Sequence, residues 1–245
     1  MLSPLYIYLA RTLLEAGADP RVVNKDGWTP LHLAVRTGDR DMVDHLLEAG
    51  PDTLEVVSNN GRSVLHTACL AGHEALVPRL LEASALSVNI QDSCGNTPVM
   101  DAARARHLPC VRLLASWPRT DLGIEDRMGR TVVEVAAQAG ATEVLQLLSE
   151  LGLDVTAGLS LHAAAREGQA EAARLLVSWG AEVDREDAMG RTPLFLSVSG
   201  QHTEAARSLL EAGARLDRKD KEGNNIEDLA RKPDVLDMIR EFSSK

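Results

Sequence analysis

Short apolar stretches with helical spacing recur along the chain and alternate with polar turns. One stretch at 31–35 is followed by a polar loop at 37–39 and by a second stretch whose apolar residues stand at 42, 43, 46 and 47. This spacing places the apolar side chains on one helix face. The pattern therefore predicts a unit of two short helices joined by a tight loop. A Leu-Leu pair like that of the second helix recurs at Leu13-Leu14, Leu80-Leu81, Leu113-Leu114, Leu147-Leu148, Leu175-Leu176 and Leu209-Leu210.

A turn that contains glycine precedes the first helix of most units. Gly27, Gly61, Gly95 and Gly129 stand 34 residues apart, and Gly223 follows Gly190 by 33. Glycine supplies the positive φ that a tight turn needs. After the first of these turns, Thr29 is placed to cap the helix and Pro30 suits its first position, because proline lacks the N–H that would be unpaired there.

The short sequence motifs around these glycines match one another. The stretch Asp26-Gly27-Trp28-Thr29-Pro30-Leu31-His32 returns as Asn60-Gly61-Arg62-Ser63-Val64-Leu65-His66, and in part as Cys94-Gly95-Asn96-Thr97-Pro98 and Met189-Gly190-Arg191-Thr192-Pro193-Leu194. A period of about 33 residues with Thr-Pro-Leu-His opening the first helix is the ankyrin signature, and the chain resembles the ankyrin-repeat family over nearly its whole length. The resemblance implies an all-α solenoid of helix–turn–helix units with short β-hairpin fingers, comprising about six full repeats, a partial N-terminal helix and a C-terminal cap.

No such unit buries its apolar face alone, so we expect a single domain over 1–245. Within it we expect a partial repeat at 5–25, units at 26–59, 60–93, 94–127, 128–157, 158–188 and 189–221, and a cap at 222–245. The unit at 158–188 lacks the Asp-Gly turn, and Leu161 follows Val133 by only 28 residues, which predicts a shortened or missing finger. In the cap, Glu227 stands where other units have Leu or Val, and a final helix is predicted from Val235 to Phe242.

The start of the chain allows two interpretations. Residues 5–19 have the pattern of a second helix whose first half is absent. Either Tyr6, Ile7 and Tyr8 improvise a cap, or the chain is a shortened form of a longer array. We favour the second, because terminal repeats normally need a polar cap.

Composition narrows the function classes. The chain is 44% hydrophobic and 25% charged, as in globular proteins, and no apolar run approaches the ~18 residues of a membrane span. Cys69, Cys94 and Cys110 lack metal-ligand spacing, which indicates reduced thiols in the cytoplasm or nucleus. A net charge of −10 repels phosphate backbones, so we expect no direct nucleic-acid binding and a partner with a basic surface. We expect a monomer.

Candidate catalytic residues are absent from the pattern. His32, His66 and His162 occupy the fourth position of the Thr-Pro-Leu-His word, where the ring bonds backbone groups, and His73, His107 and His202 share a second repeated position. The period explains these six, and no nucleophile elbow, phosphate loop or His-Glu-x-x-His element appears. We therefore predict no enzyme activity, no catalytic residue, no cofactor and no metal.

The turns offer binding candidates instead. Trp28 lies beside a turn glycine, either as a binding anchor on the concave face or packed across the turn. Lys25, two residues before Gly27, is the only lysine among the first 218 residues. The candidate concave-face and fingertip binding residues are Trp28, Asn59, Arg62, Ser93, Arg127, Arg191 and Lys221.

A closer resemblance within the family rests on four words in the same order and register. They are Asn24-Lys25-Asp26-Gly27-Trp28, Asp92-Ser93-Cys94-Gly95-Asn96-Thr97, Met100-Asp101-Ala102 and Gly200-Gln201-His202. They look like an ankyrin protein that co-regulates alanyl-tRNA synthetase. That resemblance implies binding to the synthetase catalytic domain and capture of misactivated serine on lysine, which limits Ser-mischarged tRNA(Ala) and supports translational fidelity. Only Lys25 matches an acceptor position, since the next finger, 55–59, has no lysine. The alternative is a generic ankyrin adaptor or inhibitor scaffold with an unrelated protein partner.

Overall fold

The computed structural model describes residues 12–83 and 87–243 and divides the chain into two compact units, Met1–Val132 (unit 1) and Val133–Lys245 (unit 2). Each unit is described by itself. The expectation of one domain over 1–245 stays a prediction. Tyr6, Ile7 and Tyr8 lie outside the described residues.

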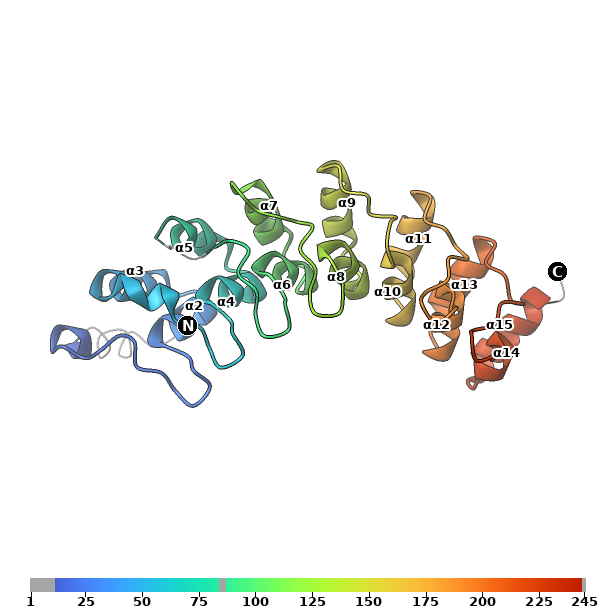
Figure 1. Ribbon diagram of the computed structural model, residues 1–245, viewed down its shortest axis with the longest axis horizontal. Coiled ribbons are helices and arrows are strands. Elements are labelled where there is room, and N and C mark those ends of the chain that lie inside the picture. Colours follow the sequence, from blue (N-terminus) through green and yellow to red (C-terminus); the bar gives the residue numbers. More distant parts are fainter. Residues whose placement is uncertain (1–11, 84–86, 244–245) are drawn as a thin grey trace. The chain divides into compact units, whose positions relative to one another are not determined.

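Unit 1 consists of helix pairs arranged in two rows. The first helices, α2 (Pro30–Thr37), α4 (Val64–Ala71) and α6 (Pro98–Arg104), lie side by side in one row, and α3 (Arg40–Ala49), α5 (Val77–Ala83) and α7 (Leu108–Ser116) form the other (Figure 1). Two 3-10 helices, η1 (Pro51–Glu55) and η2 (Glu74–Leu76), belong to the second row. Residues 12–15 are also helical. The predicted units of two short helices are confirmed.

The helix ends follow the repeated polar residues. Thr29 and Ser63 are N-caps in extended conformation, and their hydroxyls accept the N–H of His32 and His66. The first helices of these units end at Gly38 and at an equivalent glycine, both left-handed, with φ of 72° at Gly38. That conformation is easy only for glycine and lets the chain reverse into the second helix.

The core runs between the two rows of helices. Leu31, Leu46, Leu80 and Leu114 are at most 1% exposed. Alanines on the first helices, Ala34, Ala68 and Ala102, are at most 2% exposed. Because they are small, neighbouring first helices approach closely.

Unit 2 continues the same pattern of helix pairs. Its first helices are α8 (Val132–Ala139, which begins at the last residue of unit 1), α10 (Ser160–Arg166) and α12 (Pro193–Ser199); its second helices are α9 (Thr142–Glu150), α11 (Ala170–Ser178) and α13 (Thr203–Glu211). The connection from α9 to α10 covers residues 151–159, whereas that from α11 to α12 covers 179–192. The shorter connection lies where the Asp-Gly turn is missing from the sequence.

The chain ends in a four-residue helix, α14 (Ile226–Leu229), and a longer one, α15 (Pro233–Ser243). Val235, Met238 and Ile239 of α15 are buried, and α15 packs on α13. Glu227 is exposed, so the first helix of this unit has a polar outer face. This arrangement matches the predicted cap and extends the predicted final helix, Val235 to Phe242, by two residues at its start and one at its end.

The predicted β-hairpin fingers are tight turns rather than paired strands. Within residues 12–83 and 87–243 no strand forms, and the one isolated β-bridge joins Lys219 and Asn225. The Asp92 turn is closed by two backbone bonds, from the Asp92 N–H to the Asn96 carbonyl and from the Gly95 N–H to the Asp92 carbonyl, both at 2.9 Å, which are too few for a ladder. No helix among the described residues is long and apolar enough to cross a membrane.

Candidate functional site

Each turn that precedes a first helix is built around one polar side chain, which is Asn24 in the first turn, Ser58 in the second and an aspartate in the later ones. In the third unit, the Asp92 carboxylate accepts the N–H groups of Cys94 and Asn96 at 2.9 and 2.8 Å. Gly95 follows with φ of 81°, and a Cβ there would lie 2.7 Å from the Arg127 backbone nitrogen. Both the conformation and the closeness of the next turn therefore require glycine.

Successive turns are joined through the predicted fingertip residues. Their N–H groups bond carbonyls of the preceding turn: Asn59 to Asp26 at 3.1 Å, Ser93 to Asn60 at 2.9 Å, Arg127 to Cys94 at 3.0 Å, and, within unit 2, Lys221 to Met189 at 2.9 Å. The side chains of these four residues are exposed. The backbone at each fingertip thus holds the turns together while the side chain stays exposed to a partner, although the Asn59 amide also donates to the Lys25 carbonyl. That they bind one stays a prediction.

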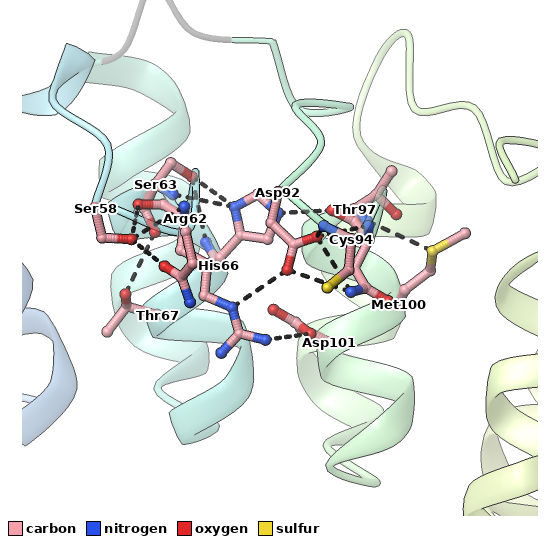
Figure 2. A network of polar contacts seen from close by, with 12 residues as sticks. Ser58, Arg62, Ser63, His66, Thr67, Asp92, Cys94, Thr97, Met100 and Asp101 are labelled. Atoms are coloured by element: carbon pink, nitrogen blue, oxygen red, sulfur yellow. Dashed lines mark hydrogen bonds and ion pairs between the residues drawn. The ribbon is translucent and has the colours of Figure 1, made fainter. Parts of the chain in front are cut away.

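Three turn arginines share one sequence position but choose different partners. Arg130 and Arg191 each bond the aspartate of their own turn, Asp126 at 2.6 Å and Asp187 at 2.7 Å. In the turn of Arg62, Ser58 stands where the other two turns have an aspartate. Arg62 reaches instead to the next unit, as Figure 2 shows, with its Nε 3.3 Å from Asp92 and its Nη2 3.5 Å from Asp101. Arg62 therefore links two repeats of unit 1 rather than bracing its own turn.

Asp101 is the buried end of this network. Its relative exposure is 0%, and its Oδ2 has no hydrogen-bond partner in the part of the chain that the structure describes. Burial raises the pKa of the carboxyl to about 6, against the opposing attraction of Arg62 and Arg104. For Asp92, burial also acts to raise the pKa, but the bonds from Asn96, Cys94 and Arg62 outweigh it and the pKa is lowered. The two neighbouring carboxyls therefore differ in how readily they bind a proton.

Trp28 is half-buried, so it is neither a fully exposed binding anchor nor fully packed across its turn. Its ring lies 5.8 Å from the ring of His32, and the Arg36 guanidinium lies 5.1 Å above the ring centre. The indole thus packs across its own helix start and also holds an arginine through a cation–π contact. Lys25, in the same turn, is exposed, and its carbonyl accepts the side-chain amide of Asn59 at 2.9 Å.

The histidines of the Thr-Pro-Leu-His word hold backbone groups, as predicted. Nε2 of His32, His66 and His162 lies 3.2, 2.9 and 3.1 Å from the carbonyl oxygens of Arg62, Asn96 and Arg191. Burial lowers the pKa of each, which keeps the rings neutral. They tie each first helix to the next turn.

The cysteines and the other possible metal ligands lie apart in the described residues. No group of three or more His, Cys, Asp or Glu side chains there is arranged to hold a metal ion. Cys69 and Cys110 are buried and Cys94 is exposed, all three as free thiols.

Sequence reasoning missed Arg36, Arg104 and Asp101 as members of a polar face. Arg36 contacts Trp28, Arg104 donates to Asn96, and Asp101 pairs with Arg62. In each case one partner is the residue directly after a turn glycine, and Arg36 and Arg104 stand nine residues after theirs. Alignment of the units on those glycines would have revealed this common position.

Comparison with known proteins agrees with the repeat. The family model described as "Ankyrin repeats (3 copies)" matches residues 6–92, 75–158 and 159–226. The Notch-regulated ankyrin repeat-containing protein B of Danio rerio is 44% identical over 39 residues, 16% of this chain and 35% of that protein. Its Xenopus tropicalis counterpart is 44% identical over 39 residues, 16% of this chain and 34% of that protein. The matched part spans about a third of these relatives.

Solved structures resemble the chain over most of its length. The human ASB11 ankyrin repeat domain has a TM-score of 0.74 at 24% identity, covering 88% of this chain and 98% of that one. The ankyrin repeat domain of Bcl-3, described as a unique member of the IkappaB protein family, has a TM-score of 0.65 at 28% identity, covering 88% of this chain and 100% of that one. With the family model matching nearly the whole sequence, the chain belongs to the ankyrin-repeat family.

Proposed function

We propose that this chain, as an ankyrin-repeat protein–protein interaction module, binds the catalytic domain of alanyl-tRNA synthetase. The observation that carries the proposal is the register of four sequence words, from Asn24-Lys25-Asp26-Gly27-Trp28 to Gly200-Gln201-His202, which resembles ankyrin repeat domain-containing protein sixteen. The fold supports the general role, because ankyrin repeats bind proteins through turns and helices that stay rigid. A cytoplasmic or nuclear location, a monomeric state and the absence of a catalytic function belong to the same proposal.

The proposed activity is capture of misactivated serine on Lys25. Seryl adenylate is an activated acyl group, and the neutral amine of a lysine attacks its carbonyl carbon. The new amide bond forms as the bond to the phosphate oxygen breaks, AMP leaves, and the amine proton passes to solvent. Proximity to the synthetase pocket raises the local concentration of the adenylate. The chain is consumed as acceptor and does not turn over. The exposed position of Lys25 at its turn is consistent with this role.

The test of capture uses purified synthetase, ATP and radiolabelled serine. We expect Lys25→Ala to lose most of the label that the parent chain retains after denaturation, while binding to the synthetase is largely kept. Lys221→Ala is the matched control, because Lys221 also stands two residues before a turn glycine and is exposed. Equal labelling of Lys25→Ala and the parent would remove Lys25 as the acceptor.

The second candidate is an adaptor or inhibitor with an unrelated partner. The Notch-regulated ankyrin repeat-containing proteins match this chain over 39 residues each, so they do not favour one partner. Affinity purification of the full chain followed by mass spectrometry separates the candidates. Enrichment of alanyl-tRNA synthetase supports the first proposal, and enrichment of another protein without the synthetase selects the second.

A further inference from the structure

One face of unit 1 carries exposed arginines among apolar side chains. Arg36 and Arg104 stand on α2 and α6, and the corresponding residue of α4 is Leu70, 39% exposed. Leu33, three residues before Arg36 and therefore on the same helix face, is 37% exposed. We call Leu33, Arg36, Leu70 and Arg104 the arginine strip. Since α4 packs against both α2 and α6, the strip crosses three neighbouring helices.

The two strip arginines are held in place by neutral groups. Arg36 lies over the Trp28 ring at 5.1 Å, and Arg104 Nη2 donates to the Asn96 side-chain oxygen. Both are exposed, and neither takes part in the ion pairs found among residues 12–83 and 87–243. Arg62 differs, since Asp92 and Asp101 already neutralise it. The strip thus presents two oriented cations that form no direct ion pair, although Arg104 is attracted to the buried Asp101 carboxyl that Arg62 already contacts.

Charge in unit 1 is divided between the two rows of helices. The turns and first helices (24–38, 58–72, 92–106 and 126–131) carry more basic than acidic side chains: Lys25, Arg36, Arg62, Arg104, Arg106, Arg127 and Arg130 against Asp26, Asp92, Asp101 and Asp126. The second helices and loops of the first two pairs (39–57 and 73–91) are acidic: Asp39, Asp41, Asp44, Glu48, Asp52, Glu55, Glu74 and Glu82 against Arg40 and Arg79. The corresponding segment with α7 (107–125) is balanced, with Arg112 and Arg119 against Asp121 and Glu125. Although the whole chain has a net charge of −10, this face of unit 1 is therefore locally basic.

We propose that the arginine strip binds an acidic segment of a partner protein, in which apolar side chains stand between two carboxylates. The inference rests on the proposed role as a protein-binding module and names the chemistry that its face recognises. The carboxylates pair with Arg36 and Arg104, and the apolar side chains cover Leu33 and Leu70. Neighbouring packed helices are about 8–10 Å apart, so the two arginines are separated by two such steps, which an extended segment spans in about six residues.

The test measures binding of a fluorescent synthetic peptide to the full chain by anisotropy. The peptide carries two glutamates about six residues apart with leucines between them, and a matched peptide has lysines in their place. We expect the acidic peptide to bind, the basic one not to bind, and the double variant Arg36→Gln/Arg104→Gln to weaken binding about tenfold, since two exposed ion pairs contribute up to about 1 kcal/mol each. The effect should shrink as salt is added.

The control variant is Arg40→Gln/Arg112→Gln, which removes the same charge from exposed positions on α3 and α7. An equal loss in both double variants would overturn the proposal, because net charge alone would then explain binding. Circular dichroism verifies that all variants remain folded. Self-association that is seen by light scattering and lost in the strip variant would also overturn it, since a second copy would then be the occupant.

Pull-down of alanyl-tRNA synthetase with the same variants separates the two proposals. Equal capture by the parent and by the strip variant would keep the synthetase role and overturn the strip as its binding face. Peptide binding that depends on the strip, without capture of the synthetase, would support the strip and refute the synthetase as partner.

Discussion

Replacing Asp101 with asparagine removes a buried charge from the network shown in Figure 2. The substitution should raise the stability of the chain relative to the parent, and this gain should be larger at neutral pH than at acidic pH. The carboxyl is 0% exposed, and its pKa is raised from 3.8 to about 6, chiefly by burial. One pKa unit corresponds to about 1.4 kcal/mol, so the ionised form costs about 3 kcal/mol in the folded state at high pH.

The sign of this pH dependence follows from the direction in which the Asp101 pKa is shifted. Well below pH 4 the carboxyl is protonated in both the folded and unfolded states, and its ionisation costs nothing. As the pH rises, the unfolded chain loses this proton first, which stabilises the unfolded state, and the loss of stability is complete above a pH of about 6. From pH 5 to pH 8 the free energy of unfolding of the parent should fall by about 1–2 kcal/mol from this group alone.

The assay is urea unfolding followed by circular dichroism at pH 5 and pH 8. Asparagine does not titrate, so the stability of Asp101→Asn minus that of the parent should increase by about 1–2 kcal/mol between the two values. A constant difference, or one that decreases with pH, would mean that attraction by Arg62 and Arg104 outweighs burial.

Asp126→Asn is the matched control. Burial acts to raise the pKa of Asp126, but the bonds from Arg130 and Met128 outweigh it and lower the pKa below its usual value. The stability that Asp126 supplies is therefore present above the unfolded pKa and is lost only as the pH falls below it. Asp126→Asn should destabilise the chain equally at pH 5 and pH 8.

Two further substitutions test the joints between repeats, both by urea unfolding. Gly72→Ala should destabilise the chain more than Gly152→Ala. Both glycines have a positive φ, which costs a non-glycine residue about 1–3 kcal/mol. Only at position 72 would the added Cβ also lie 2.6 Å from the His107 ring. His66→Ala should lower the free energy of unfolding by about 3 kcal/mol, because it empties a buried site and leaves backbone groups unpaired. His45→Ala is the control, at a half-buried position on α3, and should lower it by less than about 1 kcal/mol.

Features that depend on one unit alone were predictable from the sequence. Thr29 caps its helix and its hydroxyl contacts the ring of His32, because cap chemistry acts over a few residues. The final helix was placed within two residues by its apolar spacing and by the proline before it. The β-hairpin expectation was wrong in detail, since each turn is closed by backbone bonds of its own but no strand forms among the described residues.

Features that depend on a departure from the repeat were not predictable in the same way. The repeat register shows that Arg62, Arg130 and Arg191 are equivalent, yet only Arg62 leaves its own turn, because Ser58 cannot neutralise it and Asp92 of the next turn lies within reach. Its second partner, Asp101, is an acid at a position that other units fill with Leu, Thr, Val or Ala, so general propensity would place it in solvent. The face that binds a partner in a repeat protein is set by such exceptions, because residues common to all units are occupied in holding the units together. Here the exceptions cluster on the first helices of unit 1, so substitutions on α2, α4 and α6 should change partner choice more than equivalent changes on α3, α5 and α7.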